Sequence, residues 1–521
     1  MLIFDVYRDG APAKSVDLGG AHLLGQEAVP LRGEISVRGG RITCYKRAEG
    51  AVALALMWDA GSAGRLMLST TRLPERGQPY NLNVELARAR LMLLIQKRED
   101  WGLFDYADAA ALGEELDRVR RLFVQALQNL DDPPAAARIA DECLAQAVEL
   151  SEQTALFHAS IFLKRRRARG ADRPTLGCVA GPAGLSEPLG QRLIDALDFL
   201  WLPMPWRVTE PREGQLQYQD LDGWVDWAAK RQVPLFAGPL LSFEPNFLPD
   251  WIYIWEHEYE TLRDMLYEHV QGLVKRYGKH VAAWNVISAA HAYNPFSMSF
   301  EQIMELTRTC CAAVKQMTPK AAVLVDVALP WGEYYAGCPR TIPPMMYADM
   351  CVQSGVKFDA FGVRLLMGAP QDGLYVRDLM QVSTKLDEFT GFGKPLHVTA
   401  CQVPGGVEPD PADRWEGEQP AAGAGRWHLP WGPQVQADWV DAFYQLALSK
   451  PFVETVSWMD LSDGPGHFLA HGGLCSAALE PKPAYEVIRQ LRTSLTAPRR
   501  ARNAGKPGEA ANHNGPAGPP G

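Results

Sequence analysis

The spacing of apolar residues along the chain changes near residue 105 and again near residue 170. Residues 1–105 carry short alternating or β-branched runs that Gly, Asp and Pro interrupt, and such runs predict a β-sandwich-like domain. Residues 106–170 carry apolar residues three and four positions apart, and Pro133 after two aspartates marks the start of a helix. We therefore expect an N-terminal β domain followed by a helical connector.

Strand-like and helix-like stretches alternate from residue 171 to residue 495. The strand candidates are short apolar runs, and the stretches between them have the helical spacing of apolar residues. This alternation predicts a parallel sheet covered by helices, and eight repeats of it predict a closed (β/α)8 TIM barrel. Residues 496–521 are rich in Gly, Pro, Ala and Asn, and we expect a disordered tail there because they cannot bury enough apolar surface.

Composition and charge narrow the class of protein. Hydrophobic residues make up 47% of the chain and charged residues 22%, as in soluble globular proteins. The net charge of −9 argues against a nucleic-acid partner, since phosphates require a basic surface. No apolar run approaches the ~20 residues of a membrane span, and the N-terminus lacks the pattern of a signal peptide. The nine cysteines fit buried free thiols, so we expect a cytoplasmic protein with no membrane contact.

Six segments of the barrel region resemble glycoside hydrolase family 10, the family of endo-1,4-β-xylanases, in their residues, order and spacing. They are WRVTEPREG at 206–214, LPDW at 248–251, RY at 276–277 with AWNVI at 283–287, KPLHVT at 394–399, GL at 473–474 and EPKPAY at 480–485. The resemblance spans about residues 173–492. It implies a TIM barrel, hydrolysis of O-glycosidic bonds by two carboxylates ~5 to 5.5 Å apart, and a polysaccharide or oligosaccharide partner.

The resemblance places alanines at both catalytic positions. The family's acid/base glutamate follows strand four in Trp-Asp-x-x-Asn-Glu-Ala, and WNVISAA at 284–290 puts Ala289 at that position and Ser288 at that of the Asn. The nucleophile lies in Thr-Glu-x-Asp at strand seven, where TACQ at 399–402 puts Ala400. A methyl group neither transfers a proton nor attacks an anomeric carbon. The family's sugar-binding runs on strands two, three and six are replaced by WLPMPW at 201–206, PLLSFE at 239–244 and RLL at 364–366.

Acidic residues near the ends of predicted strands are candidates for new catalytic carboxylates, because barrel active sites lie at the carboxyl ends of the strands. They are Glu244 after strand three, Asp326 at the end of strand five and Asp460 after strand eight. The alternative for each is a salt bridge at the rim or a loop cap. A catalytic pair would have to face one bond with separated pKa values.

Eight residues are candidates for binding a ligand in the cleft: Trp284, Asn285, Ser288, His291, Arg364, Gln402, Trp431 and Trp458. We expect the two strand tryptophans to present ring faces to the cleft, and Trp431 to roof its mouth with other aromatic residues of the loop at 404–432. Exposed tryptophans also mark protein interfaces, so a protein partner stays open. The sequence has no metal-ligand spacing and no phosphate loop, and we expect neither metal nor cofactor.

Three functions stay open on the sequence. The joint replacement of both catalytic glutamates and the sugar-binding runs favours a degenerate family member whose cleft binds a carbohydrate or another ligand. The first alternative is an active O-glycosyl hydrolase that cleaves a β-linked polysaccharide with relocated carboxylates. The second alternative is a protein-interaction scaffold. The position of the N-terminal β domain beside the barrel is also that of a carbohydrate-binding module, by analogy alone.

Overall fold

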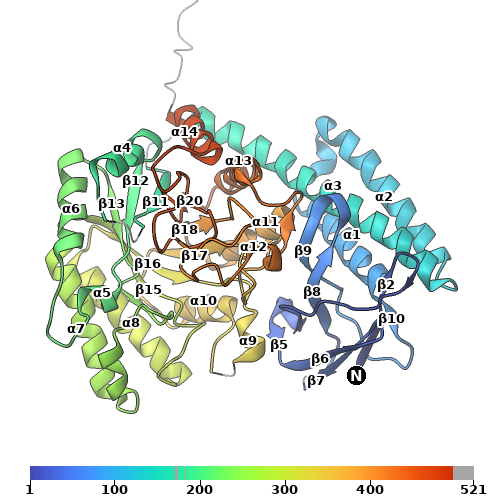
Figure 1. The fold of residues 1–521 in the computed structure, drawn as a ribbon, viewed down its shortest axis with the longest axis horizontal. Coiled ribbons are helices and arrows are strands. Elements are labelled where there is room, and N and C mark those ends of the chain that lie inside the picture. Colours follow the sequence, from blue (N-terminus) through green and yellow to red (C-terminus); the bar gives the residue numbers. More distant parts are fainter. Residues whose placement is uncertain (48, 170–173, 182–183, 339, 497–521) are drawn as a thin grey trace, which may run out of the picture.

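The computed structural model of the protein describes residues 1–47, 49–169, 174–181, 184–338 and 340–496 (Figure 1). Along the chain, an N-terminal unit with two main sheets is followed by three helices and then by a barrel. The tail predicted for residues 496–521 lies outside the described residues except for residue 496. Within the described part, no helix is long and apolar enough to cross a membrane. Eight of the nine cysteines are buried, and Cys338 is exposed.

The N-terminal unit contains a four-stranded sheet, a five-stranded sheet and a separate pair of strands. The four-stranded sheet is, in spatial order, β10 (Tyr80–Asn81), β1 (Leu2–Asp5), β7 (Arg41–Lys46) and β6 (Gly33–Arg38). The five-stranded sheet is β19 (Arg426–Trp427), β9 (Gly64–Ser69), β8 (Ala53–Asp59), β4 (His22–Leu24) and β5 (Pro30–Leu31), with the short helices η1 (Gln26–Ala28) and η2 (Gly61–Ala63) between its strands. The pair is β2 (Tyr7–Arg8) and β3 (Ala11–Pro12). These sheets confirm the β-rich N-terminal part.

Three helices and two short turns connect this unit to the barrel. They are α1 (Leu82–Asp100), η3 (Leu103–Asp105), η4 (Ala107–Ala109), α2 (Ala110–Gln128) and α3 (Pro133–Arg169). The helical part therefore begins at Leu82, earlier than the expected boundary at residue 105. The Asn81 side chain caps α1. Because α1 buries the polar residues Glu85 and Arg90 together with apolar ones, its sequence lacks the single apolar stripe that reveals α2.

The barrel is closed and all its strands are parallel. The strands are β11 (Leu176–Val179), β12 (Phe199–Leu202), β13 (Leu235–Ala237), β14 (Leu241–Ser242), β15 (Val281–Ser288), β16 (Ala322–Val327), β17 (Ala360–Leu366), β18 (Leu396–Gln402) and β20 (Val453–Trp458). Their order is β13-β12-β11-β20-β18-β17-β16-β15-β14, and the additional pairing of β13 with β15 closes the ring. Since β13 and β14 both pair with β15, they share the third strand position. The predicted (β/α)8 barrel is confirmed.

Helices cover the outside of the barrel, and shorter helices lie in its loops (Figure 1). They are α4 (Glu187–Ala196), α5 (Trp206–Thr209), α6 (Gln219–Arg231), η5 (Asp250–Trp255), α7 (Tyr259–Tyr277), α8 (Phe300–Met317), α9 (Tyr334–Gly337), α10 (Pro344–Gln353), α11 (Leu379–Glu388), η6 (Phe389–Phe392), α12 (Ala421–Ala424), α13 (Pro433–Ser449) and α14 (Pro483–Thr496). Ser299 and Asp378 begin α8 and α11 with capping boxes, in which the side chain at the third helical position returns a hydrogen bond.

Side chains alternate between the barrel interior and the helix layer. Ala283 of β15 and Leu324 of β16 belong to an inner apolar cluster with residues from other strands. The next residue along β15, Trp284, belongs to the outer cluster shared with the helices. This is the period of two that a strand imposes, and it decides which residues of each strand can reach the mouth of the barrel.

One short strand from a loop of the barrel pairs with a sheet of the N-terminal unit. β19, from the loop between β18 and α13, pairs antiparallel with β9, with Trp427 opposite Gly64. A Cβ atom at Gly64 would lie 2.3 Å from the carbonyl oxygen of Arg426, and its φ is +108°, so only glycine fits here. The five-stranded sheet is therefore completed by a barrel loop.

Candidate active site at the mouth of the barrel

A cavity of about 610 Å3 opens at the carboxyl ends of the barrel strands. This is the end of a TIM barrel at which active sites are built. Polar groups and one of the two key alanines line it: Glu244, Asn285, Asp326, Arg364, Ala400 and Asp460. All three carboxylates that the sequence singled out thus reach one cavity.

One arginine joins two of these carboxylates. Arg364 Nη2 lies 2.9 Å from Glu244 Oε2, and Arg364 Nε lies 3.3 Å from Asp326 Oδ2. Two hydroxyl groups complete the surroundings of Asp326, with Ser288 Oγ donating to Oδ2 at 2.5 Å and Thr399 Oγ1 donating to Oδ1 at 2.6 Å. Asp326 is therefore held by three neighbouring side chains. It shares the positive charge of Arg364 with Glu244.

A glycine makes room for this arrangement. A Cβ atom at Gly362 of β17 would lie 2.4 Å from Asp326 Oδ1 and 2.8 Å from the Thr399 methyl carbon. Any side chain at residue 362 would thus separate Asp326 from Thr399. The contact between β16 and β18 side chains across β17 depends on this close approach.

The ion pair sets the charge state of Glu244. Burial acts to raise the pKa of the Glu244 carboxyl, but the charge and hydrogen bond of Arg364 outweigh it and leave the pKa below its ordinary value. Burial likewise acts to lower the pKa of Arg364, and Glu244 and Asp326 reverse this. Glu244 is therefore suited to remain ionised and is unsuited to donate a proton.

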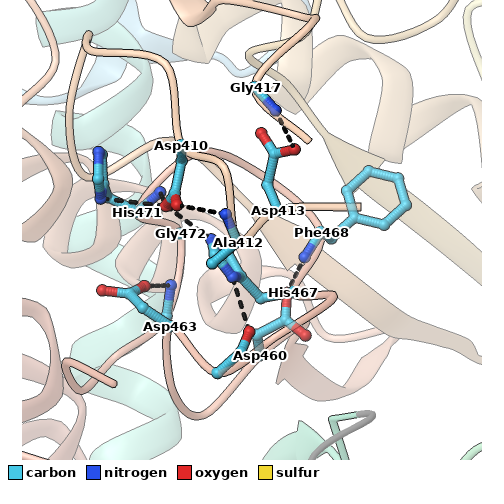
Figure 2. A network of polar contacts seen from close by, with 12 residues as sticks. Asp410, Ala412, Asp413, Gly417, Asp460, Asp463, His467, Phe468, His471 and Gly472 are labelled. Carbon is cyan, nitrogen blue, oxygen red and sulfur yellow. Dashed lines mark hydrogen bonds and ion pairs between the residues drawn. The ribbon is translucent and has the colours of Figure 1, made fainter. Parts of the chain in front are cut away.

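Asp460 has the opposite tendency in the same cavity. Its Oδ2 accepts a hydrogen bond from Gln402 Nε2 at 2.9 Å. The same oxygen accepts from the backbone N–H of Phe468 at 2.7 Å (Figure 2). Burial raises the pKa of the Asp460 carboxyl above its ordinary value. The cavity thus holds one carboxyl with a lowered pKa and one with a raised pKa, a split that acid–base pairs require.

A second polar network supports the cavity wall from behind. Asp410 Oδ2 lies 3.0 Å from His467 Nε2 and accepts a hydrogen bond from the backbone N–H of His471 at 2.9 Å (Figure 2). Burial acts to raise the pKa of Asp410, but these backbone and histidine contacts lower it overall. The network fixes residues 467–471, and with them Phe468 at the cavity. No local sequence pattern indicates this network, because Asp410 and His467 are 57 residues apart in the chain.

The two alanines that the resemblance places at the catalytic positions lie in different surroundings. Ala400 lines the cavity and stands opposite Arg364 in the register of β17 and β18. Ala289 follows β15 directly, has a φ of +58° and is fully buried. It does not belong to the cavity lining. Of these two alanines, only Ala400 therefore faces the cavity.

The predicted ligand-binding residues divide into two groups. Asn285 and Arg364 line the cavity, Ser288 contacts Arg364, and Gln402 is buried behind Asp460. His291 does not reach the cavity, because it is fully buried beside Tyr347 and its Nε2 lies 2.7 Å from the carbonyl oxygen of Ala328. Burial lowers the pKa of His291 to about 4.

The strand tryptophans do not present ring faces to the cleft, contrary to expectation. Trp284 and Trp458 are both fully buried and lie outside the cavity lining. Both belong to the apolar layer under the helices, and Trp458 Nε1 donates to the carbonyl oxygen of Gly472. Alternation along the strand is the reason, since Ala283, the neighbour of Trp284, takes the inward position.

Only some aromatic residues of the loop at 404–432 lie at the mouth of the barrel, contrary to expectation. Trp415 stays at the mouth, edge to face with Phe468. Trp427 Nε1 donates to Glu152 Oε1 of α3 at 2.7 Å, and Trp431 is buried with its Nε1 bonded to Gly425. Trp431 therefore does not line the cavity, contrary to expectation, and both tryptophans make contacts within the chain.

One comparison with known proteins identifies a family for the barrel part of the chain. A family model described as "Glycosyl hydrolase family 10" matches residues 203–490, which is more than half of the chain. A search of curated proteins found no match. Among solved structures, native xylanase 10B from Thermotoga maritima is 15% identical, with a TM-score of 0.46, over 64% of this chain and 98% of that one.

Two further solved structures give similar values. Xylanase B from Clostridium stercorarium F9 is 15% identical, with a TM-score of 0.44, over 61% of this chain and 96% of that one. An endo-1,4-beta-xylanase from Caldicellulosiruptor owensensis is 14% identical, with a TM-score of 0.45, over 63% and 98%. The match of the family model, together with the eight-stranded parallel barrel, confirms the resemblance seen in the sequence. The chain belongs to glycosyl hydrolase family 10.

Proposed function

We propose that the barrel binds a carbohydrate at its mouth and does not hydrolyse it by the retaining mechanism. The observation that carries this proposal is the position of Arg364 between Glu244 and Asp326. A retaining enzyme needs a carboxylate that is free to attack the sugar. Here one guanidinium and two hydroxyl groups occupy the carboxylate oxygens of Asp326, and Arg364 also holds Glu244.

The alanines support the same conclusion. In the family resemblance Ala400 takes the place of the nucleophile, and Ala400 lines the cavity beside Arg364. The other lining residues include groups that bind sugar hydroxyls, such as Gln217, Asn246 and Asn285. Membership of a glycoside hydrolase family makes a sugar the first ligand to test.

The test compares hydrolysis and binding in the same protein. We expect the wild-type chain to release no more reducing ends from xylan than an E244Q/D460N double variant. We also expect calorimetry to detect binding of xylotriose, and R364M to weaken it, because Arg364 holds the groups that line the cavity. Release of reducing ends above the level of the double variant would contradict the proposal.

A second candidate function rests on the opposed pKa shifts in the cavity. If hydrolysis is found, we expect Asp460, whose pKa is raised, to be the general acid and Glu244 to be its ionised partner. D460N would then reduce the rate about 10²-fold or more. The matched control is D220N, because Asp220 lines the same cavity but is exposed at its outer end. Equal loss in both variants would contradict the assignment of Asp460.

A further inference from the structure

Three residues that line the cavity carry a buried polar side-chain atom without a hydrogen-bond partner in the described part of the chain. One of these atoms, Arg364 Nε, lies beside the Asp326 carboxylate with which it forms an ion pair. The other two are Trp201 Nε1 and Asn285 Oδ1. Each residue is only 2% exposed, so solvent at the surface does not serve these atoms. One is a donor and the other an acceptor, and an alcohol hydroxyl can satisfy either kind. A buried polar group without a hydrogen bond costs stability, and a hydroxyl-bearing ligand would remove that cost.

Another part of the cavity lining is apolar. Pro203, Pro205, Val208 and Leu221 contribute aliphatic or proline side chains there, beside the polar Gln217, Gln219 and Asp220. Val208 of α5 is 55% exposed. Sugar rings pack best on the flat faces of aromatic side chains, whereas an aliphatic wall gains most from covering an alkyl or aryl group. The lining therefore offers surfaces that fit two chemically different parts of a ligand.

A second cavity of about 290 Å3 meets the first at residues that line both, among them Glu244, Arg364, Arg414 and Phe468. The Arg414 guanidinium lies 4.7 Å from the centre of the Phe468 ring and 5.4 Å from that of Trp415. Such a stacked arginine is held in place by the ring faces. Arg414 therefore presents a positive charge to both cavities.

We propose that the cavity binds a small glycoside that carries an apolar aglycone. A sugar hydroxyl would contact Trp201 Nε1 and Asn285 Oδ1, and the aglycone would lie against Val208 and the neighbouring prolines. This inference rests on the proposed sugar binding and goes beyond it by naming the ligand class. Trp201 begins the run WLPMPW at 201–206, which replaces one of the sugar-binding runs of the family, so this recognition would be specific to the residues of this chain.

The test uses calorimetry with the full chain and three ligands: methyl β-D-xyloside, hexyl β-D-xyloside and xylotriose. We expect the hexyl glycoside to bind at least about tenfold more tightly than the methyl glycoside, because its additional methylene groups are buried. W201F should weaken both xylosides about five- to tenfold, since it removes the indole N–H and keeps an aromatic ring. V208S should weaken only the hexyl glycoside, by about threefold.

Matched variants separate these effects from general damage. W439F makes the same change at Trp439, whose Nε1 also lacks a partner among the described residues but which lies outside the cavity lining. L216S changes Leu216, which is 56% exposed and also outside the lining. Neither control should alter binding, and circular dichroism reports whether every variant is folded.

Two outcomes have different meanings. Equal affinity for the methyl and hexyl glycosides, or tighter binding of xylotriose than of the hexyl glycoside, would overturn the inference and leave sugar binding intact. If none of the three ligands binds the wild-type chain, the proposed function itself fails.

Discussion

Arg364 and Glu244 form an ion pair at the mouth of the barrel, with Arg364 Nη2 2.9 Å from Glu244 Oε2. Their side chains are only 13% and 20% exposed. The same guanidinium approaches the fully buried Asp326. A charge in such surroundings depends on its partner, because water is largely excluded.

Removal of this arginine should therefore destabilise the fold. We expect R364M to lower the free energy of unfolding by about 3–5 kcal/mol, because it leaves two carboxylates without their shared cation. Urea denaturation measures the difference. The control is R231M, which breaks an exposed pair with Glu187 and should cost less than about 1 kcal/mol. Similar losses in both variants would contradict the role given to Arg364.

The buried carboxyl of Asp460 predicts that the stability of the protein depends on pH. Its folded-state pKa is raised by burial, so its carboxyl contributes most favourably at low pH and this contribution is lost as pH rises through the folded pKa. D460N has no such titration, and its side-chain oxygen still accepts from the Phe468 N–H. We expect D460N to gain stability relative to the wild type as pH rises from acid to neutral. Denaturation curves over this range would contradict the idea if the difference were constant or had the opposite slope.

His428 predicts a pH dependence at the contact between the barrel loop and α3. The hydrogen bond to Glu152 raises the pKa of His428 above its ordinary value of 6.5, although partial burial acts against it. A raised pKa means stabilisation that is complete below 6.5 and lost as pH rises through the folded pKa. The stability difference between the wild type and H428Q should therefore shrink between about pH 5 and 8. Unfolding curves with an E152Q background provide the control, since the slope should flatten there.

Arg90 and Asp378 join α1 to the start of α11 through two hydrogen bonds of 2.9 and 2.5 Å. The two side chains are 4% and 0% exposed. R90M should lower the free energy of unfolding by about 3–5 kcal/mol, because Asp378 would remain as a buried charge without its partner. R118M, which removes an exposed pair with Glu115 within α2, should cost less than about 1 kcal/mol. Chemical denaturation measures the loss of unfolding free energy in both variants. Equal losses in R90M and R118M would argue against a tight contact between the helices and the barrel.

Much of the barrel could be predicted from local patterns. Apolar periodicity gave the alternation of strands and helices, and parallel strands bring their carboxyl ends to one face. That rule alone placed Glu244, Asp326 and Asp460 near one another, and all three line one cavity. The start of α1 was missed because its buried face contains Glu85 and Arg90 as well as apolar residues.

The orientation of individual side chains was harder to predict from the sequence. A tryptophan on a strand points either into the barrel or toward the helices, and Trp284 and Trp458 both point toward the helices. A shift of one residue along the strand would have reversed this. The loop at 404–432 likewise gave no local sign that Trp427 would pair with Glu152, because 275 residues separate the two.

The sequence by itself determined the family frame, the eight-stranded barrel and the presence of alanine where the resemblance has catalytic glutamates. Those properties follow from periodicity and from the order of short motifs, which are local in the chain. Only the tertiary structure decided that Arg364 joins Glu244 to Asp326, that Gln402 is buried behind Asp460, and that Ala400 faces the cavity while Ala289 does not. The reason is that each of these contacts depends on the register between neighbouring strands and on the path of long loops, which no short segment of sequence specifies.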